Sequence, residues 1–464
     1  MARVTLGTPL RIVSNDLGLP PAKPCWKPPR PTVAIQHDAH NWVKSRLMNQ
    51  LIDSGCSKLP AMLLKRGLFA VSICLIAFNP FRVSALGLRI PNQDAEAIGR
   101  GNAFAATADN PSALYYNPAG ITQLEGQNIQ VGLLNYFGIN SDYHSPTGSS
   151  SQTDYELVPV PQVYYAFSLK DTPLSFGLGI YAPFGLGLEW PEDTGFRTLS
   201  IEGRLNYATI NPVIAWKILP TLSVAVGPTF NYSKLKLTRG LFNPVPDTDY
   251  FKFDGDDFAF GFNAGILWQP HPKWSFGVNY RSATTVNYEG TSSYTGLPST
   301  TATAQFDFPQ IVAGGISFRP TDRWNIEVDL DWTDWSTLKT VVFKNTPLAP
   351  ELPFTLDWQS SFMVEVGATY RFPAGFFISA GYFFSENSTS EEFFTPTVPD
   401  TNLHTVSVGG GYKGEHWYWA LSGQLITGPW RTVSGSVPSP AGQTADGQYQ
   451  FLIPTASASI GFHF

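Results

Sequence analysis

At 464 residues the chain is long enough for two or three ordinary domains or one large β architecture. The first 85 residues hold 11 of the 30 basic and 3 of the 36 acidic residues, so the rest carries a formal charge near −14, a poor match for nucleic-acid phosphates. Cys25, Cys56 and Cys74 all lie in those 85 residues, which excludes disulfides, thiolate metal sites and cysteine nucleophiles from the remainder.

Residues 62–85, MLLKRGLFAVSICLIAFNPFRVSA, have the pattern of a signal peptide. Lys65 and Arg66 form a basic start, an apolar stretch of residues 67–78 follows, and Val83-Ser84-Ala85 supplies a small-residue cleavage site. A buried core helix is the alternative interpretation. The order of the three parts favours export, and the apolar stretch is shorter than the ~18–20 residues of a membrane helix.

Residues 1–61 precede this signal and include PPAKPCWKPPRP, a proline-rich stretch without periodicity. The preferred interpretation is a mis-called N-terminal extension, with Met62 as the true start. An unusual genuine pre-region is the alternative. Either way, residues 1–85 are expected to lie outside the fold.

From residue 128 onward the sequence consists of strand-like segments, as 41 Gly, 38 Pro and 14% aromatic residues suggest. Fourteen segments are predicted: 128–137, 160–170, 174–184, 204–218, 221–238, 256–269, 273–287, 303–318, 323–335, 358–371, 375–386, 402–413, 416–426 and 454–464.

The connections between these segments alternate between long and short. The short ones are Asp171–Pro173, Leu219–Pro220, Pro270–Pro272, Pro320–Asp322, Pro373–Ala374 and Gly414–Glu415. The long ones include 138–159, 185–203, 336–357 and 427–453. A soluble sandwich has no reason to place every tight turn at one end, whereas an outer-membrane barrel does. The predicted fold is all-β: a 14-stranded antiparallel transmembrane β-barrel over residues 128–464.

The strand faces agree with a barrel. In WNIEVDLDW, residues 324–332, Trp, Ile, Val, Leu and Trp share one face, and Asn325, Glu327, Asp329 and Asp331 share the other. The apolar face is expected to meet lipid and the acidic face the lumen. The chain ends on Phe464 after an amphipathic strand, as bacterial outer-membrane barrels do for recognition by their assembly machinery.

No catalytic residue, metal site or cofactor is predicted. The histidines are scattered, and none has a two-histidine spacing with a carboxylate that would suggest a metal. Gly409-Gly410-Gly411 lacks the following helix and lysine of a phosphate-binding loop and is better explained by a strand bend or close packing. No G-x-S-x-G motif occurs, although an embedded hydrolase assembled from separate strands stays open.

Residues 86–127 separate the cleavage site from the first strand. They are rich in small residues, show no strand alternation, and are too polar for lipid and too few for a separate domain. Fourteen strands enclose more space than wall side chains fill. The segment is therefore predicted to be a hatch, or plug, in the lumen.

This segment resembles the hatch of the outer-membrane transporters for long-chain fatty acids and aromatic hydrocarbons. The matching stretches are Gly99-Arg100-Gly101-Asn102-Ala103, Ala108-Asp109-Asn110, Tyr116-Asn117-Pro118-Ala119-Gly120, Ala182-Pro183-Phe184-Gly185-Leu186 with Trp190, Asn211-Pro212, Pro399-Asp400 and Phe464. The resemblance covers nearly all of the chain after the cleavage site.

The resemblance implies an outer-membrane monomer that takes up a hydrophobic small molecule. Substrate would meet an apolar groove among outside loops, then a pocket touched by the N-terminal tail, and would leave sideways through a kink in the third strand. Asn117, Pro118 and Ala119 map to the hatch motif, and Pro183 and Gly185 are candidates for the wall kink; an ordinary turn and an ordinary loop start are the alternatives.

The candidate substrate-binding residues are apolar: Leu86 and Leu88 in the tail, and Phe184, Leu186, Leu188 and Trp190 in the second outside loop. Packing against the barrel rim is the alternative. A structural or adhesive barrel and a general diffusion porin are the competing functions. A hatch-like segment argues against the first, and 19 basic residues against 33 acidic ones argue against the second.

Overall fold

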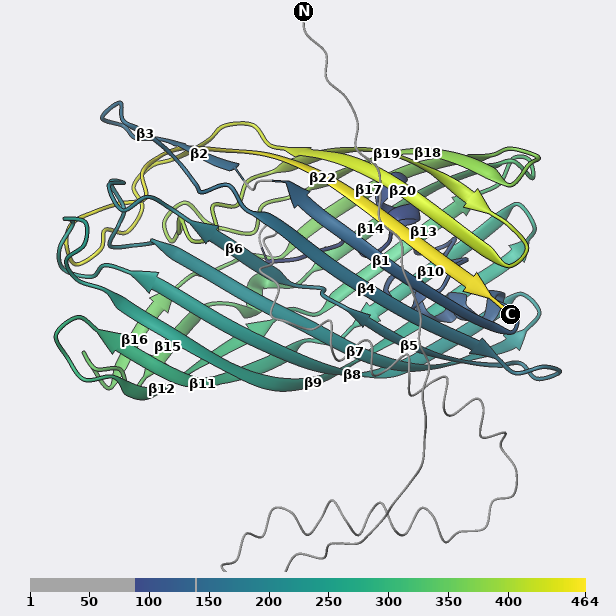
Figure 1. Ribbon diagram of the computed structural model, residues 1–464, viewed down its shortest axis with the longest axis horizontal. Helices are drawn as coiled ribbons and strands as arrows, with labels where there is room; N and C mark the ends of the chain where they lie inside the picture. Colours follow the sequence, from purple (N-terminus) through teal and green to yellow (C-terminus); the bar gives the residue numbers. More distant parts are fainter. Residues whose placement is uncertain (1–87, 138–139) are drawn as a thin grey trace, which may run out of the picture. The chain divides into compact units, whose positions relative to one another are not determined.

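The computed structural model describes residues 88–137 and 140–464, and these form a closed antiparallel β-barrel (Figure 1). The predicted extension and signal peptide, together with Leu86, lie outside the described residues. No helix in the described part is long and apolar enough to cross a membrane.

Fourteen strands build the wall, five of them in two pieces each. In chain order they are β1 (Gln127–Phe137), β4 (Leu157–Ser168), β5 (Leu174–Tyr181) with β6 (Gly185–Glu189), β7 (Glu202–Leu219), β8 (Leu222–Arg239), β9 (Phe251–His271), β10 (Trp274–Arg281) with β11 (Thr284–Tyr294), β12 (Thr300–Phe308) with β13 (Ile311–Phe318), β14 (Trp324–Thr333) with β15 (Thr340–Lys344), β16 (Glu351–Thr355) with β17 (Ser361–Arg371), β18 (Phe376–Ser385), β19 (Leu403–Lys413), β20 (Trp417–Thr427) and β22 (Gly447–His463).

Closure is made by the first and last strands. β1 pairs with β22 from Asn128 opposite His463 to Tyr136 opposite Thr455, so the sheet has no free edge at this seam. Each strand pairs antiparallel with its neighbour along the chain. The fourteen predicted strands and the alternation of short turns with long outside loops are confirmed, and the tight turns gather at one end of the barrel (Figure 1).

The predicted long loops contain more strand than expected. β2 (Asn140–His144), β3 (Ser150–Gln152), β6, β15, β16 and β21 (Arg431–Val433) all lie within them, and β9 begins at Phe251. The outward residues at the start of β9 are Lys252, Asp254 and Asp256, which are exposed. A strand that rises above the lipid loses its apolar outer face, so alternation alone does not reveal it.

The two faces of β14 are sorted as predicted. Trp324, Ile326, Val328 and Leu330 are 39–50% exposed on the outside, whereas Glu327, Asp329 and Asp331, hereafter the acidic row, are at most 4% exposed on the inside. The apolar side chains form part of the outer belt that meets lipid.

Candidate functional site: the N-terminal segment and the lumen

Residues 88–126, the N-terminal segment, pack against the inner face of the wall. Every residue from 90 to 121 is buried except Asp109, which is half-buried. The segment forms α3 (Ala95–Gly99), α4 (Ala113–Tyr116) and the 3₁₀ helix η1 (Pro118–Gln123). Gly99 lies against Gly409 of β19, so the predicted close packing at the triple glycine is present.

The predicted hatch motif fixes the end of this segment. The Asn117 side chain accepts a hydrogen bond from the Ala119 backbone N–H (3.2 Å) and caps η1, with Pro118 at its first position. The same amide donates to the carbonyls of Ala105 (2.8 Å) and of Ile266 in β9 (2.9 Å). One side chain thus joins two turns of the segment to the wall.

The acidic row binds the other half of the segment. Glu327 accepts hydrogen bonds from the backbone N–H groups of Ala106 (2.7 Å) and Thr107 (3.1 Å), and Asp329 from those of Phe104 and Ala105 (2.8 Å each). Arg100 pairs with Glu327 at 3.1 Å, and both side chains are fully buried. Breaking such a pair on one side leaves an uncompensated buried charge. The row is therefore a binding surface for the segment.

A second ionic contact has the opposite polarity. Asp109 of the segment pairs with Arg371 of β17 (2.9 Å) and Lys413 of β19 (3.3 Å), and Lys413 also pairs with Glu96 (2.8 Å). Burial alone would raise the pKa of Asp109, but Lys413 and Arg371 hold it below its usual range. This carboxylate therefore ties the segment to the wall.

The third wall strand is interrupted at the predicted kink residues Pro183 and Gly185. Tyr181 lies opposite Thr209 and Gly185 opposite Asn206, so the three residues 182–184 face two residues of β7, as in a β-bulge. On the other side β5 pairs with β4, but β6 forms no ladder with β4 in the described residues. β6 instead meets the residues before β4, where the Asp154 N–H donates to the Glu189 carbonyl (3.1 Å), so the regular ladder of the wall is broken between β4 and β6.

The start of the N-terminal segment covers this interruption. Arg89 forms an isolated bridge with Phe184, the Ile90 N–H donates to the Pro183 carbonyl (2.8 Å), and the Gly185 N–H donates to the Leu88 carbonyl (2.9 Å). Leu88–Ile90 thus replaces part of the missing ladder.

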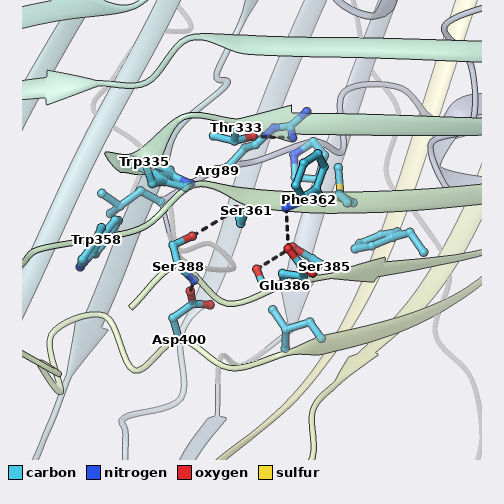
Figure 2. Close-up of a pocket in the computed structure, with 15 residues that line it drawn as sticks. Arg89, Thr333, Trp335, Trp358, Ser361, Phe362, Ser385, Glu386, Ser388 and Asp400 are labelled. Carbon is cyan, nitrogen blue, oxygen red and sulfur yellow. Dashed lines mark hydrogen bonds between the residues drawn. The ribbon is translucent and has the colours of Figure 1, made fainter. Parts of the chain in front are cut away.

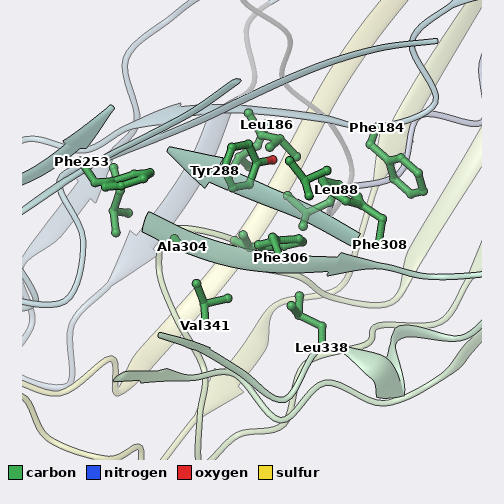
Figure 3. Close-up of a cluster of buried hydrophobic side chains, with 14 of the residues drawn as sticks. Leu88, Phe184, Leu186, Phe253, Tyr288, Ala304, Phe306, Phe308, Leu338 and Val341 are labelled. Atoms are coloured by element: carbon green, nitrogen blue, oxygen red, sulfur yellow. The ribbon is translucent and has the colours of Figure 1, made fainter. Parts of the chain in front are cut away.

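The candidate substrate-binding residues fall into two separate buried clusters. Leu88, Phe184 and Leu186 belong to a large aromatic-rich cluster, several members of which are drawn in Figure 3. Leu188 and Trp190 belong to another cluster. All five are at most 6% exposed, so they do not form an open landing surface in this structure. Their contact with substrate stays a prediction.

Arg239 adds one cation to the first cluster. Its guanidinium lies 3.6 Å from the centre of the Phe354 ring and 6.0 Å from that of Phe251. Its Nε has no acceptor, and no carboxylate pairs with it among the described residues. This residue was not predicted from the sequence, because a lone arginine at a strand end carries no signal of its own.

A small cavity of about 40 Å³ lies beside Arg89, with room for a few water molecules (Figure 2). Its walls are Trp335, Trp358, Phe362 and Met363 on the apolar side and Ser388 and Asp400 on the polar side. Burial raises the pKa of Asp400 to about 6, although its carboxylate accepts the Ser388 N–H at 2.7 Å. A second cavity of about 20 Å³ lies on the segment side of Arg89.

The second outside loop, residues 190–201, crosses to four other outside loops. Arg197, fully buried, binds Glu192 (2.8 Å) and Asp249 (3.0 Å). Trp190 donates a hydrogen bond to the Pro396 carbonyl (2.8 Å). Thr198 forms hydrogen bonds with Ser439 and Gln443. The rings of Trp190 and Phe196 both pack on Tyr143. Loop sequence did not reveal these contacts, since all the partners except Glu192 belong to other loops.

A closed antiparallel barrel with a lipid-facing apolar belt and an inward-packed N-terminal segment defines an outer-membrane barrel of the transport class. The family described as "Outer membrane protein transport protein (OMPP1/FadL/TodX)" matches residues 76–417, and the chain belongs to this family. It is an outer-membrane transport protein, not an enzyme.

Curated relatives are distant but match over most of their length. The chain is 24% identical over 379 residues to the 47 kDa outer membrane protein of Pasteurella multocida, covering 75% of this chain and 87% of that protein. It is 22% identical over 392 residues to the long-chain fatty acid transport protein of Salmonella typhi, covering 75% and 88%.

Solved structures share the fold. A Pseudomonas aeruginosa FadL homologue matches with a TM-score of 0.73 and 16% identity, over 82% of this chain and 100% of that one. The Pseudomonas putida toluene transporter TodX matches with a TM-score of 0.64 and 15% identity, over 82% and 100%.

Proposed function

We propose that the protein takes up hydrophobic small molecules, such as long-chain fatty acids or aromatic hydrocarbons, through the lumen and out through the side of the wall. The observation that carries this proposal is the position of the aromatic-rich cluster. It contains Phe184, which lies in the interruption of the third strand, and Leu88, which belongs to the stretch that covers it. A continuous apolar cluster therefore reaches the place where the ladder of the wall is broken.

The N-terminal segment acts as the hatch in this proposal. It fills the lumen, so a greasy cargo has no water-filled passage to the periplasm, and the broken ladder between β4 and β6 offers an exit into the membrane. Asn117, Pro118 and Ala119 anchor the hatch, and Pro183 and Gly185 keep the wall open. The name of the Salmonella typhi relative supports a fatty-acid cargo, and that of the Pseudomonas putida toluene transporter supports an aromatic one.

A substitution of Arg239 distinguishes a fatty-acid cargo from an aromatic hydrocarbon. An unpaired guanidinium among aromatic rings suits the carboxylate of a fatty acid, while a hydrocarbon gains nothing from its charge. Arg239→Met is expected to lower uptake of labelled oleate at least tenfold and to leave toluene uptake within twofold.

The test measures uptake of labelled oleate and of toluene by cells that make the protein and by empty-vector cells. Deletion of Pro183 removes the extra residue opposite β7 and is expected to abolish uptake of both compounds, because the wall becomes regular. If neither compound enters faster than in empty-vector cells, the transport proposal fails. If uptake survives the deletion of Pro183, only the sideways exit fails.

A further inference from the structure

The short stretch Leu88–Ile90 is held in place from two directions. Its backbone hydrogen bonds reach Pro183 and Gly185 across the interruption in the third strand. Its single long side chain, that of Arg89, points away from that strand to β14. Three residues therefore connect the interruption in the third strand to the acidic row on β14.

The β14 end of this connection is ionic. The Arg89 guanidinium pairs with Asp331. It also donates to the Thr333 hydroxyl at 3.0 Å (Figure 2). The side chains of Arg89 and Asp331 are only 13% and 5% exposed. An ion pair this sheltered is screened little by solvent, unlike the pairs on the outer surface of the barrel.

Neighbouring carboxylates favour the position of Arg89 in this ion pair. Glu365 of β17, 3% exposed, also interacts electrostatically with Arg89 and Asp331, and Asp329 lies opposite Glu365 in the ladder. If Arg89 moves away, the buried carboxylates of Asp331 and Glu365 lose this cation. That state is higher in free energy, which favours the return of Arg89, and of Leu88–Ile90 with it, to the wall.

The pair also lies between the two cavities, because Arg89 lines both of them. The larger cavity is apolar on one side and the smaller one is polar, with Asn279 Oδ1 and Asp329 Oδ1 lacking partners among the described residues. Displacement of Arg89 would join the two spaces.

We propose that the Arg89–Asp331 ion pair is the latch that keeps the interruption in the third strand closed. The pair holds Leu88–Ile90 against Pro183 and Gly185, and its rupture uncovers the side of the barrel. This inference rests on the proposed function only in taking that interruption as the exit. The latch itself does not depend on the presence of a cargo.

A cysteine at position 182 reports the state of the latch without any cargo. Ala182 is 9% exposed, and its carbonyl accepts a hydrogen bond from Gln93 at 2.7 Å, so the tail shields it. The full chain with Ala182→Cys is purified in detergent and treated with a maleimide. Mass spectrometry of the peptide that contains position 182 gives the labelling rate, whatever cysteines lie elsewhere.

Arg89→Gln and Asp331→Asn are each expected to raise this labelling rate at least tenfold. The double variant should be no faster than the faster single variant, since both changes remove one latch. The charge-swapped Arg89→Asp with Asp331→Arg should return the rate to within threefold of the parent. Lys339→Gln is the matched control, because it breaks an exposed pair with Asp357 (2.7 Å).

Heat-modifiable gel mobility first identifies which variants are folded. The latch is refuted if Arg89→Gln and Asp331→Asn are folded and both label at the parent rate, or if Lys339→Gln labels as fast as they do. A response in labelling without any uptake of oleate or toluene would refute the proposed function and leave the latch standing. Uptake without a response in labelling would refute the latch and leave the proposed function standing.

Discussion

Glu327 of β14 forms several bonds to the N-terminal segment, and the sequence of its own strand does not indicate them. Alternation along β14 predicted correctly that its side chain faces the lumen. It could not predict the partners, because Arg100, Ala106 and Thr107 are more than 200 positions away in the sequence. The same limit explains why Arg239 and Arg197 were missed: their roles depend on rings and carbonyls contributed by distant loops.

Glu327→Gln keeps the shape of this side chain and removes its charge. Arg100 would then be a fully buried cation without its carboxylate, which costs about 3 kcal/mol or more. That corresponds to roughly a hundredfold rise in local opening of the segment. We expect trypsin to cleave after Arg100 correspondingly faster in the variant, as measured by limited proteolysis of the folded barrel.

Glu289→Gln is the matched control, because Glu289 is an exposed strand carboxylate on β11. Equal cleavage rates in the two variants would show that Glu327 does not hold the segment.

Among the elements, the wall strands were predictable and the segment's fit to them was not. Strands such as β18 and β22 are recognisable from the alternation of apolar and polar residues. Short turns such as residues 372–375 are recognisable from their proline and glycine. The contact surface depends on glycines in the wall: an added Cβ at Gly277 or Gly367 would lie 2.0 Å from a segment carbonyl oxygen. Nothing in a single sequence distinguishes such a glycine from one that faces lipid.

Gly367→Ala tests this contact. The new methyl group would collide with the Arg100 carbonyl, which the backbone of the segment cannot withdraw without moving. We expect partial displacement of the segment and an ion conductance in planar bilayers several-fold above that of the parent protein. Gly314→Ala supplies the control, since the atom nearest to its added Cβ lies 3.9 Å away. Matching conductances would contradict a tight fit.

At the scale of the whole molecule, the barrel has an apolar belt outside and a polar, filled interior. The outer faces of neighbouring strands contribute exposed Val, Ile, Leu and Phe side chains, including Val328 and Ile316. Above the belt the outward residues are polar, such as Thr301 and Gln305 of β12. The apolar belt, and with it the outer-membrane location, was readable from the sequence, since it needs only the period of two. The polar strand ends above the belt were not.

A charge in the belt should therefore be costly and one above it should not. Val328→Arg is expected to lower the free energy of unfolding by about 2–4 kcal/mol, and Thr301→Arg by about 0–1 kcal/mol. Urea unfolding in lipid vesicles, followed by tryptophan fluorescence, measures both. A similar loss for the two variants would place the belt elsewhere.

The bonds between the N-terminal segment and the wall also constrain how the protein is made. The segment leaves the ribosome before the wall strands, yet its partners Glu327, Arg371 and Lys413 belong to strands that are synthesised late. Contacts between such distant parts of a chain form slowly, because a long loop must close before they contribute. Docking of the segment therefore requires β14, β17 and β19 to be in place, just before β1 and β22 close the barrel. A chain that stops short of β22 should leave the segment exposed to periplasmic proteases, so only completed barrels would retain it intact.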